Sequence, residues 1–430
     1  MPGRERYCRS AFIVFSLFEY LISLLVTGAF LAAILKQIGI ADAIAGVISS
    51  IISLSCLTQL FSGMLIKPGR SVRRTIVTLI AINQFMFSSL YLIPFIHISQ
   101  QVKTVLFILM ITGAYFIDNL AHPIKYDWLM GFVDPRERGR FTARKEMISL
   151  IGGMLFTLAM GRMVDYCNDN GRERTGFILC GVAIALIAML CFALIKSVDN
   201  APQNLGKPVS FKQKLKTIRS MIASNSCFRK LLLVDILWKS ALYVSTPFFG
   251  TYLIGELSFS LTAVSLIGIV SGLSRVLISP VFGRYADKHG YAKAIAVGFT
   301  LCATGFLICS FARPGMIRLL YIPYAILDAI ALASVNGGLV NITYEYLDRS
   351  LFAFALGAKS AISGVVGFLV SLLGSAAVRS VQARGSLLFG HTIYAQQILS
   401  AVSFLVIAFL VFYIKRVVCK LPRLDVVIDK

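Results

Sequence analysis

The sequence predicts an all-α membrane protein with twelve transmembrane helices arranged as two six-helix bundles. The chain has 430 residues, of which 57% are apolar and only 14% are charged. Soluble domains have about 45–50% apolar and about 25% charged residues, so this composition excludes an ordinary globular protein. Apolar stretches of about 20 residues recur along the whole chain without two-residue alternation, which favours membrane-spanning helices over a barrel.

The amino-terminal half is expected to form a bundle over residues 1–196. Its first apolar run follows Arg4, Arg6 and Arg9. Because this run is too long for the apolar core of a cleaved signal peptide, we interpret it as a membrane helix. The later runs are bounded by polar, basic or glycine-containing connections. The six expected helices cover residues 11–35, 43–66, 75–97, 102–128, 146–166 and 175–196.

A polar and basic connection over residues 197–230 is expected to be a cytoplasmic linker between the two halves. Within it, residues 211–222 have an amphipathic basic pattern, which fits either a helix on the anionic inner leaflet or a solvated linker helix. The second bundle, with a cytoplasmic tail, is expected over residues 231–430. Its six helices cover residues 231–254, 260–283, 294–312, 317–344, 360–378 and 392–414.

The distribution of basic residues predicts the orientation. The formal net charge is +22, and the lysines and arginines gather at the termini and in alternate connections rather than on one soluble face. This pattern argues against nucleic acid as a partner. By the positive-inside rule, both termini and the linker are cytoplasmic. The expected outer connections carry no N-x-S/T sequon, which fits a bacterial inner membrane.

The turn after the helix expected over 260–283 carries the most specific motif. Its sequence, GRYADKHGYAK, places Gly283, Asp287, Lys288, Gly290 and Lys293 in the pattern G-x-x-x-D-(R/K)-x-G-x-x-(R/K). On this segment the chain resembles the major facilitator superfamily of transporters, and the resemblance extends over nearly its whole length. It implies two six-helix bundles around a central cavity that opens alternately to either side, with these turn residues acting in gating.

Two further segments share this resemblance. A related turn in the amino-terminal half contains Gly63, Gly69 and Arg70, with Lys67 at the position where the family has an acid. The connection after the helix expected over 102–128 contains Arg138 and Gly139 in a P-x-x-R-G-R run typical of bacterial members. These residues complete the predicted gating set.

Ionisable side chains within membrane helices are costly, so each one is a functional candidate unless a neighbour neutralises it. In the resembled fold, the first, fourth, seventh and tenth helices line the cavity, and most of the candidates lie on these four. Asp118 and Asp328 are 210 residues apart, as expected for equivalent positions of a duplication. The six candidates are Glu19, Asp118, Asp235, Lys239, Arg275 and Asp328.

Local spacing suggests roles for those in the amino-terminal half. Asp118 and His122 are one helical turn apart and could relay protons, with Asn119 adding a hydrogen bond to substrate. Alternatively, His122 only caps a helix broken at Pro123. Glu19 has no local base and is expected, with Asp118, His122 and Asp328, to carry proton coupling.

The other candidates are expected to contact substrate or to form structural pairs. Asp235 and Lys239 are four residues apart, which also fits a self-neutralising pair. Arg275 has no local partner, so it could bind an anionic substrate group or a distant carboxylate. Arg162 and Asp165, at the far end of their helix, are interpreted as an interfacial pair.

The predicted function is secondary active transport of a small solute by alternating access, coupled to protons. The alternatives are an uncoupled facilitator, a lipid flippase or a membrane sensor on the same fold. A membrane enzyme would need a catalytic group, and only Asp118 with His122 comes close. The sequence has no Walker A run, the nine cysteines show no zinc spacing and the four histidines are scattered. We therefore expect no metal, no cofactor and a monomer in contact with membrane lipid.

Overall fold

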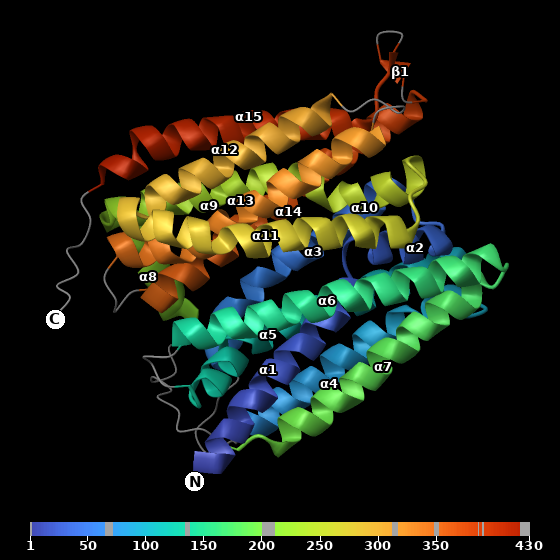
Figure 1. The fold of residues 1–430 in the computed structure, drawn as a ribbon, viewed down its shortest axis with the longest axis horizontal. Helices are drawn as coiled ribbons and strands as arrows, with labels where there is room; N and C mark the ends of the chain where they lie inside the picture. Colours follow the sequence, from blue (N-terminus) through green and yellow to red (C-terminus); the bar gives the residue numbers. More distant parts are fainter. Residues whose placement is uncertain are drawn as a thin grey trace. The chain divides into compact units, whose positions relative to one another are not determined.

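The structure is a computed structural model, and it describes residues 2–64, 72–133, 138–199, 211–311, 317–347, 352–385, 387–388 and 391–421. Nearly all of this is helical (Figure 1). Two compact units divide the chain. The first comprises Met1–Phe211 with Phe248–Leu266, and the second comprises Lys212–Pro247 with Ile267–Lys430.

The first unit is built from long helices that pack against one another. In it α1 contacts α6 and α7, while α4 contacts α5 and α7. Its α-helices are α1 (Pro2–Leu25), α2 (Gly28–Ile38), α3 (Asp42–Ser55), α4 (Val72–Leu90), α5 (Gln100–Met130), α6 (Arg138–Asp169), α7 (Glu173–Ser197) and the short α10 (Phe249–Thr251). Its other helices are the 3₁₀ segments Cys56–Met64 and Ile93–Phe95 and the π-helical turn Tyr252–Glu256.

The second unit has a similar helical make-up. In it α12 packs against α13 and α15, and α9 packs against α14 and α15. Its elements are α8 (Phe211–Ser224), α9 (Ser226–Ser245), α12 (Tyr291–Ser310), α13 (Ile317–Tyr346), α14 (Phe352–Ala383), α15 (Ala395–Arg416), the 3₁₀ turns Thr246–Phe248 and Val418–Lys420, and the antiparallel pair β1 (Leu387–Leu388) and β2 (His391–Thr392). The helix α11 (Leu261–His289) begins in the first unit and continues into the second.

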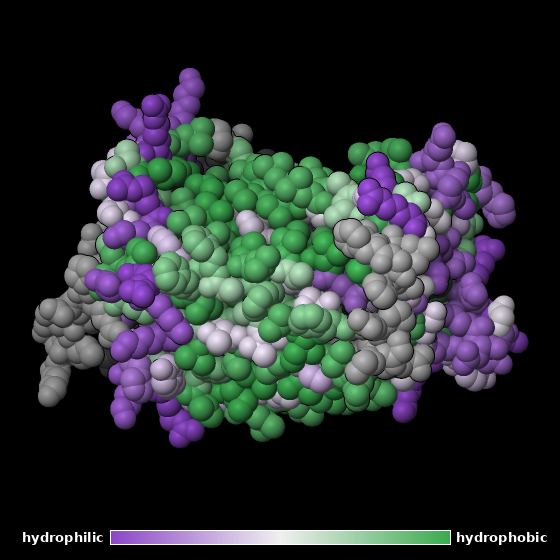
Figure 2. Space-filling view, turned by 90° about the horizontal axis from the view of Figure 1, so that it is seen from above, coloured by the Kyte–Doolittle hydropathy of each residue, from purple (hydrophilic) through white to green (hydrophobic). Residues whose placement is uncertain are grey.

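Eleven of the helical segments in the described ranges are long and apolar enough to cross a membrane. On the face shown in Figure 2, apolar side chains occupy the middle and hydrophilic side chains gather at both ends. The chain is thus an all-helical, multi-pass membrane protein, apart from the two-residue strands. The helix expected over residues 75–97 corresponds to α4, which is not among the eleven.

The first expected helix, over residues 11–35, is wrong as a single element. The structure starts it at Pro2 and breaks it between α1 and α2 at Val26 and Thr27. The carbonyl oxygens freed at the break accept hydrogen bonds from two tyrosines: Tyr91 Oη donates to Leu25 O and Tyr115 Oη to Val26 O, both at 2.6 Å. Irregular backbone at membrane depth is tolerated only where such partners exist.

Two other expected helices change type along their length. The run over 43–66 is α-helical only to Ser55 and then 3₁₀, where the hydroxyls of Ser55, Thr58 and Ser62 donate to carbonyls three residues earlier. Such side-chain bonds compete with the α-helical ladder. The run over 231–254 leaves α9 at Ser245 for the 3₁₀ turn that contains Pro247, a residue that cannot donate to the helix.

The core of the first unit joins α1, α4, α5 and α7 through a cluster of buried apolar side chains. Phe12, Phe15, Ile76, Trp128 and Ile195 are its large members. The helix α6 packs closely on α1, because a Cβ at Gly153 would lie 2.4 Å from the Tyr20 ring. This packing fixes the positions of α1 and α5, which carry the candidate site.

Candidate functional site

The charged site of the first unit centres on a buried lysine that the sequence analysis missed. Lys125 is 5% exposed on α5. Its Nζ donates to Glu19 Oε1 of α1 at 2.5 Å and lies 3.7 Å from Asp118 Oδ1, two turns earlier on α5. The same ammonium lies 5.7 Å from the centre of the Phe15 ring. We call Glu19, Asp118 and Lys125 the Lys125 cluster.

A cavity of about 230 Å³ adjoins the Lys125 cluster within the first unit. The two carboxylates differ in their access to it. Glu19, 27% exposed, is hydrogen-bonded to the lysine, whereas Asp118 is 40% exposed and beyond hydrogen-bond distance from it. The cavity is lined by Glu19, Tyr20, Ile22, Ser23, Val26, Thr27, Ile52, Asn83, Gln84, Phe87, Tyr115, Asp118, His122 and Lys125. One carboxylate of the cluster thus remains open to a proton or a solute.

His122 lines the same cavity as Asp118, as their spacing on one helix face predicts. Its ring is exposed and stacks on Tyr126, with centroids 6.2 Å apart. The alternative that His122 caps a broken helix is wrong, because α5 continues through Pro123 to Met130. This continuation is what places Lys125 on the helix face of Asp118.

The side chain of Asn119 is hydrogen-bonded to other protein groups and does not line the cavity. Its Nδ2 donates to Ser55 Oγ at 2.7 Å and to Tyr115 O at 3.2 Å, and its Oδ1 accepts from Gln59 Nε2 at 2.8 Å. The bonds with Ser55 and Gln59 join α5 to α3 and to the following 3₁₀ segment. The geometry assigns Asn119 to packing between helices.

The second unit contains another buried lysine, and it corrects the expected partner of Asp235. Lys359 of α14 is 1% exposed; its Nζ lies 3.1 Å from Asp235 Oδ2 and donates to Thr343 Oγ1 at 2.9 Å. Lys239, the partner expected from spacing, interacts with Asp235 electrostatically, while its ammonium lies 5.3 Å from the centre of the Tyr243 ring. Spacing along one helix could not reveal a partner on α14.

Asp328 lies in the second unit beside a thiol and within electrostatic reach of a base. Cys302 Sγ donates to Asp328 Oδ1 at 3.4 Å. The half-buried Arg275 of α11 interacts electrostatically with Asp328. Of the two roles considered for Arg275, the distant carboxylate is therefore the one for which the structure provides a partner.

The expected gating turn takes the form of a helix–turn–helix junction. Gly283, Asp287 and Lys288 lie in the last part of α11, with Asp287 exposed, and Lys293 lies in the first turn of α12. Gly290 precedes α12 with φ +91°, a conformation that requires glycine.

The other gating candidates are only partly described. Gly63 lies in the 3₁₀ segment after α3, and Arg138 and Gly139 lie in the first turn of α6. Gly69 and Arg70 lie outside the described residues. Over the described ranges, no group of three or more His, Cys, Asp or Glu side chains could hold a metal ion.

Apolar spans, together with a cavity lined by two carboxylates and a buried lysine, are typical of a membrane transporter. The chain belongs to the MFS/sugar transport protein family, whose model matches residues 82–414. The family places it among transporters of small molecules rather than enzymes, and the resemblance to the major facilitator superfamily is confirmed. No curated protein matches the chain.

Solved structures of transporters share the fold at low sequence identity. A mutant of the nucleoside transporter NupG is 12% identical, with a TM-score of 0.73 over 95% of this chain and 99% of that one. A D-xylose-proton symporter is 14% identical, with a TM-score of 0.65 over 94% and 96%. A POT family peptide transporter is 13% identical, with a TM-score of 0.69 over 96% and 97%.

Proposed function

We propose that the chain is a secondary transporter that moves a small solute by alternating access and couples this movement to protons at the Lys125 cluster. In this proposal α4 completes twelve spans, which form two six-helix bundles over residues 1–196 and 231–430, joined by the linker 197–230. The family match supports transport, and the neighbour described as a proton symporter is consistent with proton coupling.

The observation that carries the coupling proposal is the charge count beside the cavity. Within the Lys125 cluster two carboxylates, Glu19 and Asp118, face one ammonium, Lys125, so these three groups together carry one net negative charge. Lys145 of α6 interacts electrostatically with Glu19 and offsets this charge in part. An unneutralised charge in a low-dielectric site is costly. A proton on either carboxylate leaves one acid and one base, which is a neutral cluster.

Neutralisation links proton binding to a change of conformation. While both acids are ionised, Lys125 binds Glu19 and holds α1 to α5. A proton on Glu19 weakens that bond and leaves Asp118 as the remaining anionic partner of the lysine. The ammonium then shifts along α5, and the restraint between α1 and α5 is relieved. Asp328, in its own unit, is proposed as a second proton site.

The test is solute uptake by purified protein reconstituted in liposomes, with and without an imposed pH gradient. Substrates are first found by thermal-shift screening of a solute library. We expect the wild type to accumulate a hit only under the gradient. Glu19→Gln and Asp118→Asn should bind it but only equilibrate it. Asp127→Asn, an exposed acid of the same helix, is the matched control.

Accumulation that ignores the gradient, or variants that behave as the wild type, would overturn proton coupling. The protein would then be an uncoupled facilitator, a lipid flippase or a sensor, and lipid translocation assays would separate these.

We also propose a monomer in a bacterial inner membrane, with both termini cytoplasmic. Reporter fusions at the two termini test the orientation, since a reporter active only outside the cytoplasm should stay inactive at both.

A further inference from the structure

The segment Phe248–Leu266 packs with the first unit, although the chain on both sides of it belongs to the second. It contacts α2 and α3 through α10 and the following π-helical turn. We call it the 248–266 segment. Its packing is close, since a Cβ at Gly46 would lie 2.0 Å from the Phe248 ring and one at Gly250 would lie 2.7 Å from Gly28 O.

The strongest polar contact of this segment is made by Asp165, near the end of α6. Its Oδ1 accepts from the backbone N–H of Leu261 at 3.1 Å, and its Oδ2 accepts from that of Thr262 at 2.7 Å. These are the first two amides of α11, and the first amides of a helix have no partner within it. A carboxylate at this position is also favoured by the helix dipole.

The cap of α11 is therefore shared between two distant parts of the chain. Ser260, the residue before the helix, accepts with its Oγ from Ala263 N at 3.1 Å. Asp165 supplies acceptors for the two amides that Ser260 does not reach. If the segment left α6, these two N–H groups would lose a charged acceptor. The interfacial pair that we expected between Arg162 and Asp165 does not explain this geometry.

Neighbouring contacts fix the same stretch of α6 along α11. Ser265 Oγ donates to Thr157 O at 3.0 Å. Gly161 allows the approach, because an added Cβ would lie 3.0 Å from the backbone of Leu261. The contact therefore spans from Thr157 to Asp165, about two turns of α6.

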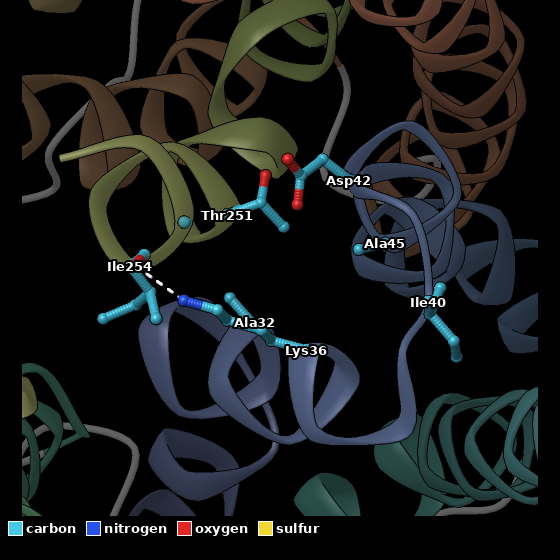
Figure 3. A pocket seen from close by; sticks show the side chains of 8 residues that line it. Ala32, Lys36, Ile40, Asp42, Ala45, Thr251 and Ile254 are labelled. Atoms are coloured by element: carbon cyan, nitrogen blue, oxygen red, sulfur yellow. Dashed lines mark hydrogen bonds between the residues drawn. The ribbon is translucent and has the colours of Figure 1, made fainter. Parts of the chain in front are cut away.

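A second charge reaches the other end of the segment (Figure 3). Lys36, near the end of α2, points toward Ile254 and donates to its carbonyl oxygen at 3.5 Å. Asp42 and Thr251 border the same small pocket. Both charged side chains thus bind main-chain groups of the segment. The ammonium of Lys36 donates to a carbonyl oxygen, and the carboxylate of Asp165 accepts from two amides.

We propose that Asp165 is a latch that holds the 248–266 segment against the rest of the first unit in one state of the transport cycle and sets how often the segment detaches. The proposal rests on the alternating access proposed above. It adds a positioning residue that is remote from the Lys125 cluster, and its readout requires neither a solute nor a proton gradient.

The test uses a cysteine reporter under the segment. Ala45 is fully buried and borders the pocket of Figure 3. Ala45→Cys should therefore react with a maleimide only when the segment detaches. We expect Asp165→Ala to raise the labelling rate about tenfold or more, since hydrogen bonds to a charged group are among the stronger ones. Asp165→Asn, which keeps one acceptor oxygen and the side-chain size, should give a smaller rise.

Controls separate the latch from other effects. Asp169→Asn, an exposed acid one turn further along α6, should leave the labelling rate unchanged. The chain without the reporter gives the background of the nine native cysteines. An unchanged rate in Asp165→Ala and Asp165→Asn would overturn the latch. Faster labelling without pH-coupled uptake would keep the latch and reject the coupling proposal.

Discussion

Among the described residues, each unit of the molecule buries one lysine that pairs with a carboxylate from another helix, but the two surroundings differ. Lys359 has one carboxylate, Asp235, and one hydroxyl, Thr343, and its side chain is 1% exposed. Lys125 has two carboxylates, and one of them is 40% exposed beside a cavity. Counted over the ion pairs within 4.0 Å, the first arrangement is balanced in charge and closed, whereas the second has one more acid than base and is open.

The difference separates a structural ion pair from a site that can exchange a proton. Breaking a closed pair leaves a buried charge that water cannot reach, so the free energy of unfolding falls. Breaking an open one leaves groups that reach the cavity. We therefore expect the Lys359 pair to govern stability and the Lys125 cluster to govern activity. Four measurements test this contrast, in order of decreasing expected effect.

The largest effect is expected for Lys359→Met, which leaves the buried Asp235 without its ammonium. The free energy of unfolding should fall by about 3–5 kcal/mol, measured by denaturation of the purified protein in detergent. Adding Asp235→Asn should recover much of this loss. Lys239→Met is the matched control, because that ammonium faces the Tyr243 ring and its loss should change stability by about 1 kcal/mol or less. Equal losses at the two lysines would contradict the contrast.

Lys125→Met should spare folding more than Lys359→Met and affect activity more. The acids it leaves reach the cavity and can take up protons, so we expect stability to fall by roughly 1–3 kcal/mol. Solute accumulation driven by pH should be abolished, measured as uptake with and without the gradient. A variant that still accumulated solute would remove the Lys125 cluster from the coupling mechanism.

Asn119→Ala tests whether Asn119 belongs to the solute site or only holds helices together. The substitution removes three hydrogen bonds, two of which join α5 to its neighbours, so the free energy of unfolding should fall by about 1–2 kcal/mol. Solute affinity, measured by binding to the purified protein, should stay the same. A selective loss of affinity at unchanged stability would restore Asn119 as a substrate contact.

The smallest effect is expected for an exposed pair, Arg4 and Asp199, whose side chains are 2.5 Å apart. The hydrogen bond from Arg4 lowers the pKa of Asp199 in the folded protein. The pair therefore contributes stability at neutral pH that is lost as the pH falls below about 4. Arg4→Gln should lower the unfolding temperature slightly at pH 7 and by less at pH 3, and salt should reduce the difference. If Arg4→Gln lowered the unfolding temperature more at pH 3 than at pH 7, the predicted pH dependence of this ion pair would be wrong.

The sequence alone predicted the class of fold and the acidic members of the two lysine sites, but not the lysines themselves. Hydropathy is a local property, so apolar runs predict the spans, and an acid inside such a run stands out. Glu19, Asp118 and Asp235 were identified in this way, and the structure places each of them within 4.0 Å of a buried lysine.

The two lysines were missed for different reasons. Lys125 is 106 residues from Glu19 but only seven from Asp118, and it lies inside the helix expected over 102–128, after a proline that suggested a break. Lys359 fell one residue before the helix expected over 360–378, whereas α14 begins at Phe352. An apolar flank around an isolated lysine is the signal that could have found both. The break between α1 and α2 was unpredictable, since the tyrosines that satisfy it come from other segments.

That break has a consequence for the order in which the protein is made. Until Tyr91 and Tyr115 have been synthesised, the carbonyls of Leu25 and Val26 have no external donor, and only a straight helix satisfies them in the bilayer. We therefore expect residues 11–35 to enter the bilayer as one continuous helix. The two tyrosines lie 66 and 89 residues after the residues whose carbonyls they bind, so we expect the bend to form only once both have been synthesised. Biogenesis would then include a step of helix bending in a segment that is already inserted.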